Sequence, residues 1–169
     1  MIPYSELHLF AARAILQRAP AEVEIRRSLS GLYYSLFHRF TTSGASIFAA
    51  GGAALQGQAT RAYSHANMRK VCESYIRSPK RPFQPPLDAL APMPPDQRLI
   101  AVADAFVKLQ EARHSADYDL AAAFTKQEGV ELLQLASLAH QNFSDIQHPP
   151  ETQVFLAALL LADRWTRRG

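Results

Sequence analysis

The sequence is poor in the residues on which secreted and membrane proteins depend. Its single cysteine, Cys72, cannot form an internal disulfide, and disulfides are typical of oxidising compartments. Its first residues lack the charged start and following apolar run of a secretory leader. The most apolar stretch, residues 154–162, has nine residues, about half of the roughly 20 that a membrane-spanning helix needs. We therefore expect a cytoplasmic protein that does not cross a membrane.

The chain also lacks the common signatures of metal and cofactor sites. It has no glycine-rich phosphate loop and no GxGxxG, HExxH or GxSxG motif. One cysteine excludes a thiolate-rich zinc site, and no two of the six histidines have the four-residue spacing of a helical metal site. We expect neither a metal nor a cofactor.

A length of 169 residues suits one domain with a single substantial core, so we expect one helical domain over residues 1–169. The formal net charge of +3 permits nucleic acid as a partner without requiring it. No segment alternates apolar and polar residues over the length of a strand. The sequence therefore predicts an all-α fold, an antiparallel bundle of about five to six helices.

Residues 20–43 predict a long central helix with two faces. One face is apolar at helical spacing and should be buried; it consists of Ile25, Leu29, Leu32, Leu36 and Phe40. Arg27, Tyr34 and His38 follow the same spacing on roughly the opposite side. This polar stripe is either packed at a second interface with satisfied hydrogen bonds, or lines a site or a subunit contact.

The other segments are assigned from spacing, capping residues and prolines. A further helix is predicted over 4–18, with Ser5 as N-cap and with Leu9, Ala12 and Leu16 on one face. Others are predicted over 58–78, 96–113, 125–143 and 149–169, the last an additional C-terminal helix. The connections are a flexible loop or frayed extension at 44–57, a proline-rich connector at 79–95 and a bend at 114–123. Thr125 and Glu128 have the form of a capping box.

The helix that begins near residue 96 carries an arginine in a buried register. Its buried face is predicted to contain Leu99, Val102, Phe106 and Leu109. Extending this spacing by four reaches Arg113. Because an unpaired buried charge costs several kcal/mol, we expect Arg113 to have an acidic or polar partner.

Three groups of residues could carry chemistry. They are Arg61 with His65, one turn apart; Arg113 with Asp117 and Tyr118; and Arg27 with Tyr34 and His38. If their helices are adjacent, they form a cationic pocket with imidazoles, which suits cleavage of RNA without metal. In the structural alternative, Arg113 and Asp117 form an ion pair and Tyr118 closes the bend. A small-ligand carrier, suggested by the aromatic residues of the long helix, is explained better by core packing.

Three segments together resemble the HEPN superfamily, particularly its small prokaryotic branch. They are RRSLSGLYYSLFH at 26–38, RAYSHANM at 61–68 and LQEARHSADYDL at 109–120. The first is similar to the RRA-x(4)-AYYA-x-FH pattern of the family's second helix, and the last to its R-x(3)-DY element. The resemblance covers most of residues 5–145.

The resemblance implies a helical bundle that forms a homodimer and belongs to a toxin–antitoxin or defence system, often beside a minimal nucleotidyltransferase. Many members are ribonucleases with an R-x(4–6)-H motif at the dimer interface. Arg113 matches the motif's arginine, whereas Asp117 and Tyr118 stand where a histidine followed closely by a tyrosine is expected. An imidazole would then have to come from His38 or His65.

Two hypotheses follow. In the first, the protein binds RNA through Arg27, Arg61 and Tyr34 and cuts it without metal. In the second, it is a non-catalytic module that dimerises and engages a nucleotidyltransferase antitoxin or a nucleotide. The resemblance makes Tyr118 the candidate for modification by that partner.

Overall fold

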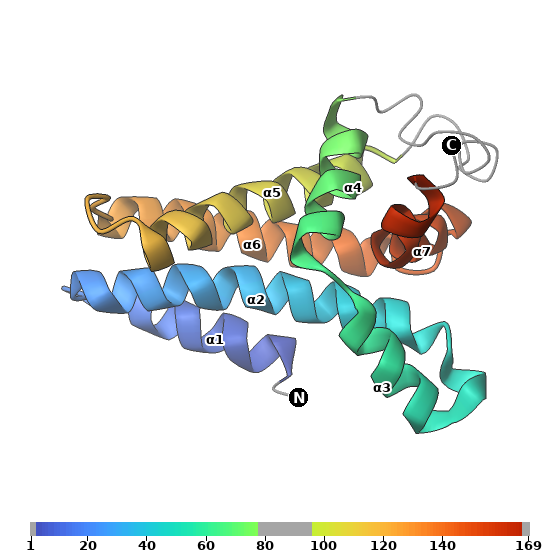
Figure 1. Cartoon of the computed structure of the whole chain (residues 1–169). Coiled ribbons are helices and arrows are strands. Elements are labelled where there is room, and N and C mark those ends of the chain that lie inside the picture. The colour runs from blue at the N-terminus through green and yellow to red at the C-terminus, as the bar shows by residue number, and fades with distance from the viewer. Residues whose placement is uncertain (1–2, 78–95, 167–169) are drawn as a thin grey trace. The chain divides into compact units, whose positions relative to one another are not determined.

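The structure of the protein is a computed structural model that describes residues 3–77 and 96–166, with side chains up to 161. The described residues form seven α-helices, one short 3-10 helix and no strand, as Figure 1 shows. These helices are α1 (Tyr4–Ile15), α2 (Glu22–Ser46), η1 (Ala49–Gly51), α3 (Gly52–Ala62), α4 (His65–Arg77), α5 (Gln97–Tyr118), α6 (Lys126–Asp145) and α7 (Pro150–Thr166). The predicted all-α helical bundle is confirmed, with more helices than the five or six expected.

The chain divides into two compact units, each described by itself below. The first unit contains residues 1–39 and 105–141, and the second contains residues 40–104 and 142–169. The predicted proline-rich connector at 79–95 lies outside the described residues. None of the described helices is long and apolar enough to span a bilayer.

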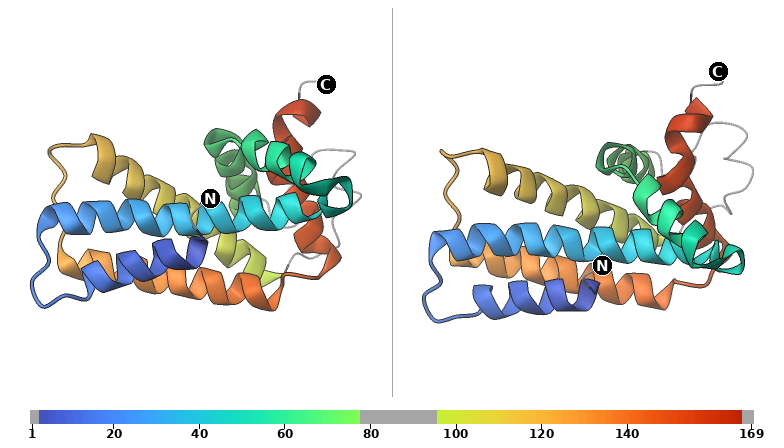
Figure 2. Two further views of the ribbon diagram at one scale, coloured as in Figure 1. Left: turned by 90° about the horizontal axis from the view of Figure 1, so that it is seen from below. Right: turned by 60° about the horizontal axis from the view of Figure 1, so that its bottom comes forward.

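In the first unit, α1, α5 and α6 lie alongside α2, as both figures of the whole chain show (Figures 1 and 2). Arg26 near the start of α2 contacts Ala116 near the end of α5, so these two helices are antiparallel. Arg39, farther along α2, contacts His140 near the end of α6, so α2 and α6 run in the same direction. The helix α1 runs antiparallel to α6, because Ile15 lies beside Gly129 and His8 beside Ser137.

The predicted buried faces of the two long helices are confirmed. On α2, the five residues of the apolar face are at most 3% exposed: Ile25, Leu29, Leu32, Leu36 and Phe40. On α5, the four predicted core residues are completely buried: Leu99, Val102, Phe106 and Leu109. The spacing of apolar residues by three and four positions therefore predicted the buried face of both helices.

The first helix buries a face other than the one its leucines suggested. Leu9 and Leu16 are 53% and 61% exposed, whereas Ala11 and Ile15 are fully buried. A Cβ atom placed on Gly31 of α2 would lie 3.5 Å from the Ala11 Cβ. Small residues thus allow α1 to approach α2 closely, and this contact decides which side of α1 faces inward. Pro3 stands at the N-cap position in place of the predicted Ser5.

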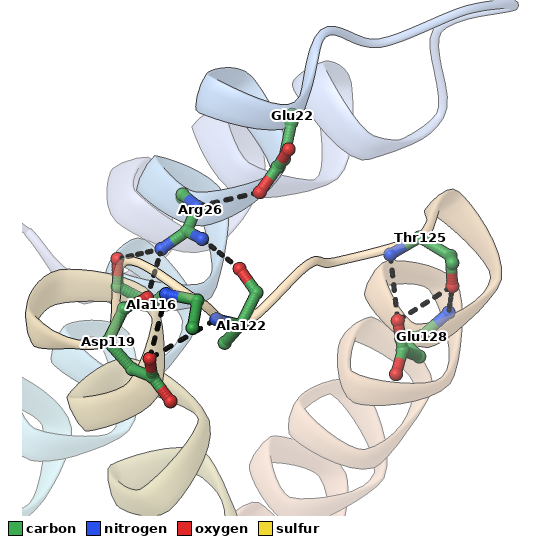
Figure 3. A network of polar contacts seen from close by, with 8 residues as sticks. Glu22, Arg26, Ala116, Asp119, Ala122, Thr125 and Glu128 are labelled. Carbon is green, nitrogen blue, oxygen red and sulfur yellow. Dashed lines mark hydrogen bonds and ion pairs between the residues drawn. The ribbon is translucent and has the colours of Figure 1, made fainter.

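The start of α6 has the capping box that the sequence predicted. The backbone N–H of Thr125 donates to Glu128 Oε2 over 2.7 Å, and the N–H of Glu128 donates to Thr125 Oγ1 over 3.2 Å (Figure 3). The Thr125 N–H and hydroxyl both donate to the Glu128 carboxylate and lower the pKa of Glu128 below its usual value. Two N–H groups that a helix start leaves without partners are satisfied in this way.

The bend predicted at 114–123 starts too early, because α5 continues to Tyr118. The guanidinium of Arg26 donates to the carbonyl oxygens of Ala116, Asp119 and Ala122, and its Nε lies 3.0 Å from Glu22 Oε1 (Figure 3). A cation at this position provides hydrogen bonds to the last carbonyl groups of the helix, and it interacts favourably with the negative end of the helix dipole. Arg26 therefore extends α5 and fixes the turn that follows.

In the second unit, the predicted single helix over 58–78 is wrong, because α3 ends at Ala62 and α4 begins at His65. Tyr63 between them is extended, with φ −69° and ψ 130°. Its buried ring occupies the space above Gly44, and its hydroxyl donates to the Leu156 carbonyl over 3.4 Å. Insertion of this ring explains the break, and burial raises the pKa of Tyr63 to about 12. Residues 44–57, predicted as loop or frayed extension, are mostly helical.

Aromatic packing and one buried carboxylate hold the rest of the second unit. The Phe155 ring of α7 lies 5.6 Å from Phe40 and 5.1 Å from Tyr75, centroid to centroid. Glu151 in the first turn of α7 accepts the Asp96 N–H through both carboxylate oxygens, at 2.9 and 3.0 Å. Burial raises the pKa of Glu151 above its usual value. The start of α5 is thus capped by a side chain from α7.

Arg26→Lys should lower the free energy of unfolding by about 2 kcal/mol, because an ammonium cannot reach three diverging carbonyl oxygens from one position. Chemical denaturation measures this loss. The matched control is Arg27→Lys, since Arg27 is exposed. Equal stability of the two variants would show that Arg26 does not stabilise the turn.

Candidate functional site

The candidate site lies in the first unit, where the last turn of α5 faces α2. Arg113, Asp117 and Tyr118 come from α5, and Ser30 and Tyr34 come from α2. The antiparallel packing of the helices brings residues separated by about 80 positions into contact. Side chains at 30 and 34 are one turn apart, as are those at 113 and 117, so each helix presents them on one face.

Arg113 has the acidic and polar partners that its buried register predicted. Its Nε lies 2.7 Å from Asp117 Oδ2, and its Nη2 donates to the Tyr34 hydroxyl over 3.2 Å. The Arg113 side chain is 20% exposed. Its position is therefore fixed from two helices while part of the side chain still reaches the surface.

Two tyrosine rings also contact this guanidinium. The Arg113 Cζ lies 5.5 Å from the centroid of the Tyr34 ring and 5.4 Å from that of the Tyr118 ring. Both distances are typical of cation–π contacts. Burial acts to lower the pKa of Arg113. The electrostatic effect of Tyr34, Asp117 and Tyr118 is larger and raises this pKa above its usual value. The site thus holds one permanent positive charge between aromatic side chains.

Asp117 orients the arginine. Its Oδ2 contacts Arg113, and its Oδ1 accepts a hydrogen bond from Ser30 Oγ over 2.6 Å. Since both carboxylate oxygens are engaged, Asp117 links α5 to α2 and holds the guanidinium. This geometry contains the predicted ion pair, and Ser30 is a member of the site that the sequence analysis missed.

His38 lies next to the same aromatic group. Its ring centroid is 6.2 Å from that of Tyr34 and 5.7 Å from that of Phe37. Burial lowers the pKa of His38 below 6.5, so the imidazole is neutral at pH 7 and able to accept a proton. Tyr34 therefore contacts both the arginine and the predicted imidazole of the site.

Tyr118 and Arg27 are the accessible members. Tyr118 is the last residue of α5, is 64% exposed, and has its ring 5.1 Å from that of His114. Arg27 is exposed on α2, two turns before Tyr34. Both can meet a ligand from solvent.

Arg61 and His65 belong to the second unit. The prediction that one helix carries them a turn apart is wrong, because Arg61 lies in the last turn of α3 and His65 begins α4. Both residues are exposed. The hypothesis that they share a cavity with Arg113 stays a prediction.

The structure also shows a polar cluster of the first unit that the sequence analysis missed. Arg39 of α2 donates to the His140 carbonyl over 2.6 Å, and the His140 ring lies 5.1 Å from that of His8 of α1. Tyr4 stacks on His140 with a centroid distance of 5.5 Å. The available signal was helical spacing, since Tyr4 and His8, and likewise Ser35 and Arg39, are four residues apart.

Among the side chains that the structure describes, no three of His, Cys, Asp and Glu gather as metal ligands would. No protein-family model, curated protein or solved structure matches the chain. The geometry of the Arg113 site and the resemblance of the three sequence segments therefore carry the functional assignment.

Tyr34→Phe should lower the free energy of unfolding by about 1 kcal/mol, because it removes the acceptor of an arginine N–H and keeps the ring. Chemical denaturation is the measurement. Tyr118→Phe is the matched control and should change stability little, since this tyrosine is mostly exposed. A loss in Tyr118→Phe as large as that in Tyr34→Phe would contradict the described geometry.

Proposed function

We propose that the protein is a HEPN-type RNA-binding protein of a toxin–antitoxin or defence module, which cuts RNA without a metal ion. The observation that carries this proposal is the Arg113 guanidinium, fixed by Asp117 and in contact with Tyr34 and Tyr118. A fixed, partly exposed cation suits a phosphate, and aromatic rings suit unpaired bases. The net charge of +3 favours a polyanionic ligand.

The cleavage chemistry needs a proton acceptor and a cation near the reacting phosphate. His38 is neutral at pH 7 and can take the proton of a ribose 2′-hydroxyl. Attack of that oxygen on the adjacent phosphorus forms a 2′,3′-cyclic phosphate and breaks the bond to the 5′-oxygen, which leaves and takes up a proton. Arg113 would stabilise the charge that grows on the phosphorane.

The remaining candidates would bind the RNA. Arg27 lies on the same helix as Tyr34 and offers an exposed charge. The exposed side chains of Arg61 and His65, which belong to the second unit, would also bind RNA. A homodimer would place two copies of the site on one RNA.

Arg113→Ala should reduce RNA cleavage in the presence of EDTA at least about 100-fold, because it removes the only cation placed at the developing charge in this mechanism. Cleavage is measured on labelled RNA with excess protein. The matched control is Arg13→Ala, which removes an exposed arginine of the first unit and should leave the rate unchanged. Circular dichroism checks that both variants fold. Intact RNA with excess wild-type protein would overturn the catalytic proposal.

The exposure of Tyr118 favours a second candidate function. A hydroxyl on a ring that is 64% exposed is accessible to another enzyme. In this alternative the protein is a non-catalytic module that dimerises and engages a nucleotidyltransferase antitoxin or a nucleotide. The partner would transfer a nucleotidyl group from a nucleoside triphosphate to the Tyr118 hydroxyl; the new O–P bond replaces the hydroxyl O–H bond, and pyrophosphate leaves.

Co-expression with a minimal nucleotidyltransferase encoded beside the protein should add one nucleotidyl group to Tyr118, located by mass spectrometry. Tyr118→Phe should abolish the addition. Tyr34→Phe is the control, because the Tyr34 hydroxyl accepts a hydrogen bond from Arg113 and lies on a partly buried residue. An unmodified Tyr118 would eliminate this alternative.

A further inference from the structure

The first helix buries only part of its apolar surface. Ala11 and Ile15 are its fully buried residues, and Leu7 is half-buried. Leu9 and Phe10 of the helix, and Leu16 directly after it, are 53–61% exposed. Because buried apolar area is the main source of packing free energy, polar contacts carry an unusual share of the attachment of α1.

Those polar contacts gather in one cluster, here called the imidazole clasp. It consists of Tyr4 and His8 from α1, Ser35 and Arg39 from α2, and Ser137 and His140 from α6. The Arg39 Cζ lies 5.1 Å from the centroid of the Tyr4 ring. Tyr4 and His8, the side chains that α1 contributes, therefore contact residues of α2 or α6.

The hydrogen bonds of the clasp define where the proton of His140 lies. The Ser35 hydroxyl donates to the Leu32 carbonyl over 2.7 Å, so its oxygen accepts from His140 Nε2 over 3.0 Å. The other ring nitrogen, Nδ1, then carries a lone pair and accepts from Arg39 Nη1 over 3.2 Å. His140 is thus held as the neutral Nε2–H tautomer.

His8 is held in the same way. The Ser137 hydroxyl donates to the Leu133 carbonyl over 2.8 Å, so its oxygen accepts from His8 Nε2 over 3.2 Å. His8 Nδ1 is buried and has no hydrogen-bond partner within the described part of the chain. A proton added to this nitrogen would lie in the interior without an acceptor.

Protonation therefore destabilises the clasp at both histidines. On His140 it would turn the acceptor that faces Arg39 into a second donor beside a positive charge. Burial first, and then Arg39 and His8, lower the pKa of His140 to about 3. Burial also lowers the pKa of His8 below 6.5. The groups of the clasp that face the two rings supply one positive charge and no carboxylate.

We propose that the imidazole clasp is a proton-sensitive attachment that releases α1 from the first unit when the pH falls. Once α1 has left, His8 is in solvent and titrates near 6.5. The released state then binds more protons than the attached state between that pH and the lowered values. Release is favoured as the pH falls through this window and is unaffected above it.

Hydrogen exchange of the full-length protein, followed by mass spectrometry, tests the proposal. Exchange of α1 amides at pH 7.5 and 5.5 is corrected for the intrinsic effect of pH. We expect opening of α1 to increase up to about 10-fold per pH unit for each proton taken up, while the central amides of α6 keep their protection.

Three variants provide the comparisons. His8→Gln with His140→Gln keeps a side-chain N–H donor at each position and should remove the pH dependence, and His8→Gln alone should reduce it. His148→Gln, at an exposed histidine, should retain the wild-type response. Constant protection of wild-type α1 between the two pH values would overturn the proposal. So would equal loss of protection in α1 and α6, or an unchanged response in the double variant.

Discussion

The first unit depends on the burial of α2 over most of its circumference. Its apolar face is closed by Leu29, Leu32 and Leu36, but the neighbouring residues Ser28, Tyr33 and Ser35 are also completely buried. A helix that is covered on several sides needs a neighbour on each of them. The helices α1, α5 and α6 supply this cover, and every polar cluster of the unit described above includes a residue of α2.

Polar residues on α2 then determine how each neighbour is held. Ser30 and Tyr34 meet Asp117 and Arg113 of α5, whereas Ser35 and Arg39 meet His140 of α6. Arg26 fixes the end of α5 through backbone carbonyls. Since hydrogen bonds are directional and apolar packing is not, these contacts set the register of each helix against α2.

Features that follow from residue spacing within one helix were predicted from the sequence. Features that depend on contacts between residues distant in the chain were missed. The buried faces of α2 and α5 and the capping box of α6 follow from spacing within one helix, and all three are confirmed. The orientation of α1 was wrong because it depends on Gly31, and the break at Tyr63 was missed because it depends on Gly44. Neither contact leaves a trace in local periodicity.

The candidate site likewise combines a contact within one helix, which the sequence predicted, with contacts between helices, which it did not. The need of Arg113 for a polar partner followed from its place in the buried register, and Asp117 was one turn away in the same helix. Ser30 could not be predicted as a member, because its contact with Asp117 requires the antiparallel pairing of α2 with α5. The cluster of Arg39, His8 and His140 likewise joins three helices, so the spacing of histidines along the chain gave no sign of it.

Two arginines of the first unit, Arg39 and Arg113, have different surroundings and therefore suit different roles. Arg39 is 6% exposed and contacts imidazole and carbonyl groups, so its charge lies inside the protein and is sensitive to any proton added beside it. Arg113 is more exposed, is oriented by a carboxylate and has an accessible tyrosine over it. Because the phosphate of the proposed RNA ligand would have to reach the guanidinium from solvent, Arg113 suits that role, whereas Arg39 is suited to hold the helices together.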